Sequence, residues 1–125
     1  MPKILLIDDD EDLLEITKSL LKKRGYDVAI ENNWQNALQT ITTFNPQIIL
    51  LDVFLKDVDG LDICRQLKSM PHTKDIPVMI CSAYPSVAER VIYEYGADDF
   101  IAKPFEVNDL IAKVHSILSQ TKGLA

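Results

Sequence analysis

Five polar side chains of this sequence could together carry out phosphoryl chemistry. Asp8 and Asp9 follow one short apolar run, Asp52 follows another, and Ser82 and Lys103 follow two more. Three carboxylates in one pocket would repel one another unless a cation lay between them, and Mg²⁺ prefers oxygen ligands of this kind. Ser82 could donate a hydrogen bond to a phosphoryl group, and Lys103 could place a positive charge on one of its oxygens. Asp52 would then be the nucleophile, forming an aspartyl phosphate.

These side chains meet only if the apolar runs are strands of one parallel sheet. Residues 48–51 are four large apolar residues without alternation, which is typical of a strand buried on both faces. Further strands are predicted at residues 3–7, 26–30, 76–81 and 99–102. Helical patterns lie between and after them, so the unit βα occurs five times. This predicts an α/β fold, a single doubly wound five-stranded parallel sheet in the flavodoxin-like order 2-1-3-4-5.

Apolar residues at helical spacing follow each predicted strand. The first helix begins after the acidic run at residues 8–12 and ends at Lys22-Lys23-Arg24, before Gly25. Asn32 or Asn33 can cap the second helix. The second helix is expected to turn these residues inward: Trp34, Ala37, Leu38 and Ile41.

The third helix is expected to open at Gly60 and the last to extend to about Leu118. Ser86 and Glu89 have the spacing of a capping box for the fourth helix. The residues expected to face inward from that helix are Val87, Val91, Ile92 and Tyr95.

Composition excludes several classes of function. The formal net charge of −6 argues against nucleic-acid binding by this chain alone, because phosphate contacts need a basic face. No apolar stretch approaches the roughly 20 residues that cross a bilayer, so no membrane partner is expected. The N-terminus leads directly into a strand without a signal-peptide layout, which predicts a cytoplasmic location. Cys64 and Cys81 are interpreted as small buried apolar residues.

Four motifs make the chain resemble the receiver domain of two-component response regulators, from about Lys3 to Leu118. They are Ile4-Leu5-Leu6-Ile7-Asp8-Asp9-Asp10, Leu50-Leu51-Asp52 with Gly60 eight residues later, Cys81-Ser82-Ala83, and the run Gly96-Ala97-Asp98-Asp99-Phe100-Ile101-Ala102-Lys103-Pro104-Phe105. The resemblance assigns residues 1–122 to the receiver domain and residues 123–125 to a C-terminal tail. The chain departs from the common receiver pattern at two positions. Lys56 stands where most receivers have proline, and Phe100 stands where tyrosine is commoner.

The resemblance implies a phosphoacceptor. A histidine kinase or phosphotransfer protein would donate its phosphoryl group to Asp52, so the domain would catalyse only its own phosphorylation and dephosphorylation. Asp8, Asp9 and Asp52 would hold Mg²⁺ together with the backbone carbonyl of Phe54. Ser82 and Lys103 would contact the phosphoryl oxygens, and the Lys103-Pro104 bond would be cis.

The resemblance also implies a switch. Ser82 would move toward the phosphoryl group and Phe100 would turn into the vacated space. The fourth helix, the fifth strand and the fifth helix would form an output face for a downstream protein or an output domain. A homodimer through the same face, with Asp98 and Asp99 pairing with Lys113, is a further option.

Two aromatic residues flank the expected site, Phe54 two residues after Asp52 and Tyr84 two residues after Ser82. Our hypothesis is that they shield the acyl phosphate from water and slow its hydrolysis.

Other functions fit these residues less well. A pseudo-receiver, which binds partners without phosphotransfer, usually lacks the acceptor, the acidic pair or the lysine, all of which are present. A phosphatase of the haloacid-dehalogenase type needs a second carboxylate at the position of Phe54. A flavin-binding module would need a phosphate loop where Asp8-Asp9-Asp10 stands.

Overall fold

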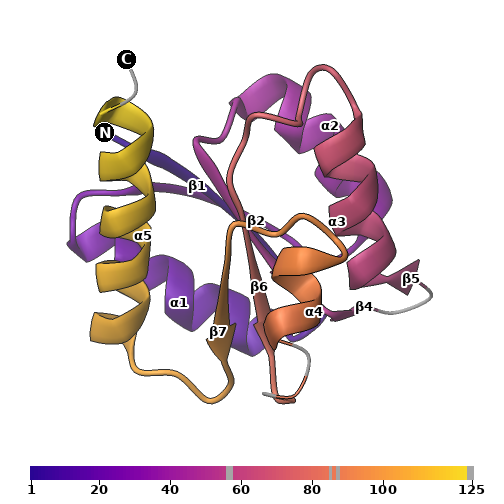
Figure 1. The fold of residues 1–125 in the computed structure, drawn as a ribbon. Helices are drawn as coiled ribbons and strands as arrows, with labels where there is room; N and C mark the ends of the chain where they lie inside the picture. Colours follow the sequence, from indigo (N-terminus) through magenta and orange to yellow (C-terminus); the bar gives the residue numbers. More distant parts are fainter. Residues whose placement is uncertain (56–57, 85, 87, 124–125) are drawn as a thin grey trace.

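The computed structural model describes residues 1–55, 58–84, 86 and 88–123. Its centre is a five-stranded parallel sheet with the strand order β2-β1-β3-β6-β7 (Figure 1). The strands are β1 (Lys3–Ile7), β2 (Asp27–Glu31), β3 (Ile48–Asp52), β6 (Val78–Ser82) and β7 (Asp99–Ala102). Counted along the chain, these long strands have the order 2-1-3-4-5, so the predicted fold class is confirmed. The second and fourth strands begin one and two residues later than expected.

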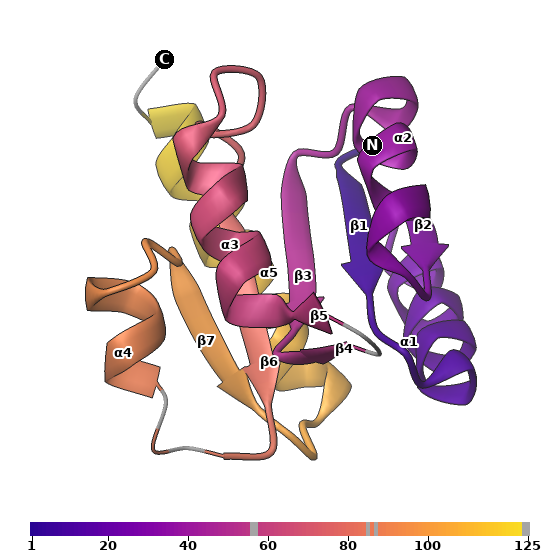
Figure 2. The same ribbon diagram turned by 90° about the vertical axis from the view of Figure 1, so that its right-hand side faces the viewer.

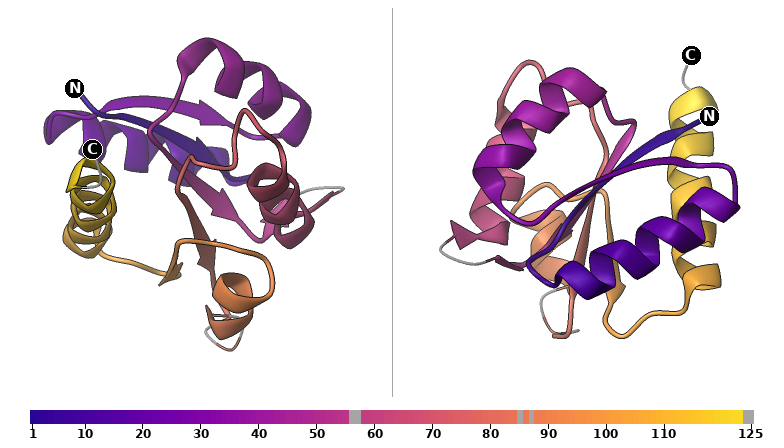
Figure 3. Two further views of the ribbon diagram at one scale, coloured as in Figure 1. Left: turned by 45° about the horizontal axis from the view of Figure 1, so that its top comes forward. Right: turned by 180° about the vertical axis from the view of Figure 1, so that it is seen from behind.

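Helices cover both faces of the sheet. They are α1 (Glu11–Lys23), α2 (Trp34–Phe44), α3 (Gly60–Ser69), α4 (Ala88–Tyr93) and α5 (Val107–Gly123). The helices α1 and α5 lie together on one face, as Figure 3 shows from behind, and α2 and α3 cover the other face (Figure 2). The helix α4 packs beside β7 at the edge of the sheet.

The core consists of two apolar layers, one on each face of the sheet. Leu5, Ile49 and Leu51 belong to the layer under α2 and α3, whereas Ile4 and Leu50 belong to the layer under α1 and α5. Neighbouring residues of one strand therefore point into different layers. Every residue of β3 and of β6 is buried, which explains why these runs show no polar alternation.

Side-chain caps define where the helices begin. The Asp10 carboxylate accepts a hydrogen bond from the backbone N–H of Leu13 at the start of α1. Of the two asparagines proposed for α2, Asn33 is the cap, and it accepts from the N–H of Asn36 at 2.9 Å. These contacts satisfy N–H groups that have no partner inside the helix.

Two inward positions predicted from helical spacing are wrong. Leu38 of α2 is 40% exposed and Ile92 of α4 is 39% exposed. In α2 the covered stripe is therefore narrower than the apolar stripe of the sequence. Tyr95 does pack against the core, as predicted, and its ring lies under the Arg65 guanidinium at 4.6 Å.

Some predictions concern residues that the structure does not describe. Lys56 and Val87 lie outside the described residues. The capping box of Ser86 with Glu89 and the inward position of Val91 depend on side chains that are also outside the description. Among the described residues, no helix has the length and apolar character needed to span a membrane.

Candidate functional site

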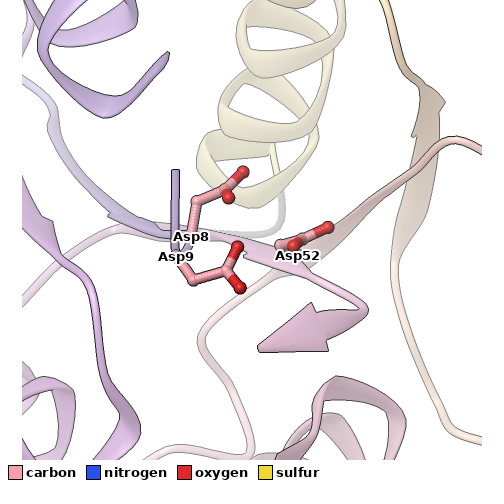
Figure 4. Close-up of side chains that lie close together, drawn as sticks. All are labelled: Asp8, Asp9 and Asp52. Atoms are coloured by element: carbon pink, nitrogen blue, oxygen red, sulfur yellow. The ribbon is translucent and has the colours of Figure 1, made fainter. Parts of the chain in front are cut away.

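The acidic site forms where β1 and β3 end side by side. Ile7 pairs with Leu51 in the parallel register, so the residues that follow, Asp8 and Asp52, lie at the same edge of the sheet. Figure 4 shows the side chains of Asp8, Asp9 and Asp52 close together at this edge. One carboxylate oxygen from each lies within 4.8 Å of the others. Asp8 and Asp52 are buried, while Asp9 is exposed to solvent.

Lys103 provides the positive charge against these carboxylates. It follows β7, whose register with β6 places Ala102 opposite Ser82. Its Nζ lies 2.5 Å from Oδ2 of Asp8 and 3.3 Å from Oδ1 of Asp52. The other oxygen of Asp8, Oδ1, accepts a hydrogen bond from the N–H of Asp10 at 3.0 Å. The Lys103-Pro104 peptide bond is cis, as predicted.

The environment opposes ionisation of Asp52. Burial, together with the negative charge of Asp8, raises the pKa of the Asp52 carboxyl to about 6, although Lys103 acts in the opposite direction. Burial by itself would lower the pKa of Lys103, but its hydrogen bond with Asp8 and the charges of Asp8 and Asp52 raise it above its ordinary value. A further cation would therefore favour the ionised form of Asp52.

Ser82 lies at the same edge, at the end of β6. Its side chain is fully buried, and its hydroxyl oxygen accepts a hydrogen bond from the N–H of Tyr84 at 3.0 Å. The backbone oxygen of Ser82 accepts from the N–H of Lys103 at 2.8 Å. The Tyr84 side chain is 56% exposed.

Gly60 shapes the loop that follows Asp52, a role that the sequence did not reveal. Its N–H donates to the carbonyl oxygen of Val53 at 2.7 Å. A Cβ at this position would lie 2.3 Å from the backbone oxygen of Asp52, closer than any side chain tolerates. Two short strands lie between Val53 and Gly60, namely β4 (Phe54–Leu55) and β5 (Val58–Asp59). They pair in the antiparallel sense, which was not predicted. Phe54 contributes backbone to this hairpin, and its side chain is outside the description.

Comparison of the chain with known proteins identifies its family. The family model of the response regulator receiver domain matches residues 4–115. The chain belongs to this family. Receiver domains are signalling modules of two-component systems, in which they interact with histidine kinases and output domains.

Individual relatives agree with the family. The response regulator MprA of Mycobacterium leprae is 37% identical over 121 residues, which are 96% of this chain and 52% of the relative. The chain thus spans about half the length of the curated relatives that it matches. The Francisella response regulator 1452 receiver domain has a TM-score of 0.87 at 28% identity, covering 97% of this chain and 99% of that one. The receiver domain of a Syntrophus aciditrophicus histidine kinase gives 0.87 at 31% identity, covering 98% and 93%.

The charged residues considered for a receiver homodimer form ion pairs inside one chain. Asp99 pairs with Lys113 at 3.2 Å. Asp98 pairs with Lys68 at 2.9 Å and accepts from the N–H of Val78 at 2.8 Å. The possible pairing of Asp98 and Asp99 with Lys113 across a homodimer stays a prediction. Phe100, the expected switch residue, is partly buried and packs against the core layer under α2 and α3.

Proposed function

We propose that this receiver domain is a Mg²⁺-dependent phosphoacceptor, which takes a phosphoryl group from a histidine kinase or phosphotransfer protein onto Asp52. The observation that carries the proposal is the convergence of three carboxylates, one ammonium group and one buried hydroxyl at a single edge of the sheet. In open α/β sheets this edge is where ligands bind.

The donor atoms fit Mg²⁺. Asp8, Asp9 and Asp52 offer oxygen ligands within 4.8 Å of one another, and the carbonyl of Phe54 would add a fourth. The raised pKa of Asp52 also supports a Mg²⁺ site. A bound cation would offset the repulsion between the crowded carboxylates and so stabilise their ionised forms. When bound, Mg²⁺ would neutralise negative charge on the phosphoryl oxygens.

The chain's own residues supply the remaining steps. An ionised Asp52 oxygen attacks phosphorus, the P–N bond of the phosphohistidine breaks, and the nitrogen of the donor imidazole keeps the electron pair. The Lys103 ammonium group holds one phosphoryl oxygen. The Ser82 hydroxyl, which accepts from the N–H of Tyr84 in this structure, would move toward the phosphoryl group and donate to another of its oxygens.

That movement of Ser82 is the start of the proposed switch. A phosphoryl group adds roughly 1.5–2 negative charges beside a buried hydroxyl. The space released next to β6 would accept Phe100, whose backbone pairs with Ile80 in the neighbouring strand. The output face for a downstream protein or output domain would consist of α4, β7 and α5. Moving the population from 1:99 to 99:1 needs about 5.5 kcal/mol of differential stabilisation.

The test is phosphorylation by acetyl phosphate, followed by intact mass spectrometry. We expect one added phosphoryl group on the wild type with Mg²⁺, and none on Asp52→Asn or after chelation of Mg²⁺. Asp12→Asn is the matched control, since Asp12 is an exposed carboxylate on α1 outside the site. An adduct that survives in Asp52→Asn would refute the assignment of the acceptor. No adduct on the wild type, with no effect of beryllofluoride on the signals of Phe100, would favour the pseudo-receiver.

A further inference from the structure

Tyr95, just after the end of α4, is held by arginines from two helices. The Arg65 guanidinium of α3 lies 4.6 Å from the centroid of the Tyr95 ring, and the Arg90 guanidinium of α4 lies 6.0 Å from the same centroid. An Nη atom of Arg90 is also 3.4 Å from the Tyr95 hydroxyl oxygen. A guanidinium at such a distance is attracted to the face of an aromatic ring. The ring therefore links the C-terminal end of α4 to α3.

The backbone that follows α4 is attached to the same helix and to the sheet. The carbonyl oxygen of Tyr95 accepts from the Cys64 thiol of α3 at 3.5 Å. Asp98 pairs with Lys68 of α3 at 2.9 Å, and its N–H donates to the carbonyl oxygen of Val78 at 2.8 Å. Since β6 begins at Val78 and ends at Ser82, these attachments lie at the edge of the sheet opposite the acidic site.

The other end of α4 lies close in sequence to Ser82. Because β6 ends at Ser82 and α4 begins at Ala88, only residues 83–87 connect the two. Ser82 is the residue whose displacement starts the proposed switch. A short connection of this kind transmits a displacement at the end of β6 to the beginning of α4.

We propose that the Tyr95 clamp, formed by Arg65, Tyr95 and Arg90, fixes the C-terminal end of α4 to α3 while the N-terminal end follows Ser82. The helix then moves about its clamped end, and a few residues beside that end absorb the change, as in other hinge motions. The movement of α4 rests on the proposed function, whereas the clamp does not.

Amide hydrogen exchange tests the clamp in the protein without ligands. The N–H of Glu94 donates to the carbonyl oxygen of Arg90 at 2.8 Å, so its exchange reports opening of the last turn of α4. Arg65→Met removes the guanidinium from an exposed position of α3 and keeps an unbranched side chain. We expect Glu94 to exchange about two- to fivefold faster in this variant. Gln66→Met, at the next exposed position of α3, is the matched control and should leave the rate unchanged.

Nuclear magnetic resonance with Mg²⁺ and beryllofluoride tests the movement. The amide signal of Ala88 should shift when the phosphoryl analogue binds. The nuclear Overhauser contacts between the Tyr95 ring and the Arg65 side chain should persist in the same sample, because the clamped end stays in place.

Each result has an opposite that would overturn the proposal. Equal exchange of Glu94 in Arg65→Met and the wild type would show that the clamp does not hold α4. Loss of the contacts between Tyr95 and Arg65 on binding, or a shift at Asp52 without one at Ala88, would contradict the movement. If beryllofluoride shifted no signal at Asp52, the proposed function would fail and the movement with it, while the exchange rates would still decide the clamp.

Discussion

The Lys103 ammonium nitrogen lies closer to Asp8 than to Asp52, at 2.5 Å from Oδ2 of Asp8 and 3.3 Å from Oδ1 of Asp52. The lysine therefore bridges the two buried carboxylates and serves as their counter-ion. The carboxylate nearest to Lys103 is thus that of Asp8, an expected metal ligand, and not that of Asp52, the expected phosphoacceptor. A cation bound between the carboxylates would share this role, so the lysine and Mg²⁺ should partly substitute for one another in stabilising the fold.

Replacing Lys103 with methionine should therefore lower the free energy of unfolding by about 1–3 kcal/mol in the absence of Mg²⁺, because it leaves buried carboxylates without a partner. Mg²⁺ should restore more stability to this variant than it adds to the wild type. Urea denaturation with and without Mg²⁺ measures both effects. Lys113→Met, which removes the partner of Asp99 away from the site, is the control. Equal stabilisation of Lys103→Met and the wild type by Mg²⁺ would contradict the shared role.

The raised pKa of Asp52 predicts a pH-dependent cost of folding. The folded state binds the Asp52 proton more tightly than the unfolded state, since its pKa moves from 3.8 to about 6. The free energy of unfolding should thus fall as pH rises through this window and then level off. Asp52→Asn removes the charge and should be more stable than the wild type by about 1–3 kcal/mol at pH 7.

That gain of Asp52→Asn should shrink as pH falls from about 6 to 3.8 and be nearly lost at about pH 3.5, where the carboxyl is protonated in the folded state and mostly protonated in the unfolded state. Denaturation curves between pH 3.5 and 8 in the presence of a chelator provide the measurement. Asp12→Asn, at an exposed position of α1, should show no comparable gain at pH 7. A stability difference for Asp52→Asn that does not depend on pH would show that ionisation of the carboxyl is not its cause.

Gly60→Ala should disturb the loop after Asp52 strongly. The added Cβ would meet backbone atoms of Asp52 at 2.3 Å and of Val53 at 2.7 Å, and backbone cannot move aside as a flexible side chain can. We expect a loss of about 2–4 kcal/mol in the free energy of unfolding, together with weaker Mg²⁺ binding.

Gly25→Ala is the matched control for that change. Gly25 has a positive φ of +92°, and nothing lies within 4 Å of an added Cβ. This variant should lose only about 1 kcal/mol, from backbone strain alone, and should bind Mg²⁺ normally. If the two variants were equally stable, the close approach at Gly60 would not be limiting.

The aromatic residues at 54 and 84 predict a long-lived phosphoryl group. Combining Phe54→Asn with Tyr84→Glu should shorten the half-life of the aspartyl phosphate, because water would reach the phosphorus more easily. A decrease of about 1.4 kcal/mol in the barrier corresponds to a tenfold shorter half-life. Mass spectrometry of the phosphorylated protein over time would follow the loss. Tyr93→Glu, at another exposed tyrosine, should leave the half-life unchanged; an unaltered half-life in the double variant would disprove the shielding hypothesis.

The order of the strands and helices could be predicted because it depends on local hydrophobic patterns. Residues 48–52 are the observed strand β3, and their unbroken apolar character follows from burial on both faces. The position of Asp52 at the end of that strand, and of Asp8 at the end of its neighbour, predicted that the two carboxylates meet. The family motif around Lys103-Pro104 likewise indicated the cis peptide bond before the structure showed it.

The tertiary structure decided what depends on packing between distant segments. Leu38 and Ile92 fit an inward stripe by spacing, yet they are 40% and 39% exposed in the packed structure. The choice of Asp8 as the closer partner of Lys103 and the approach of Gly60 to the backbone of Asp52 both involve atoms from different elements. Periodicity along the chain reports which side of an element is buried, while distances across the chain are set only when the sheet and its helices pack together.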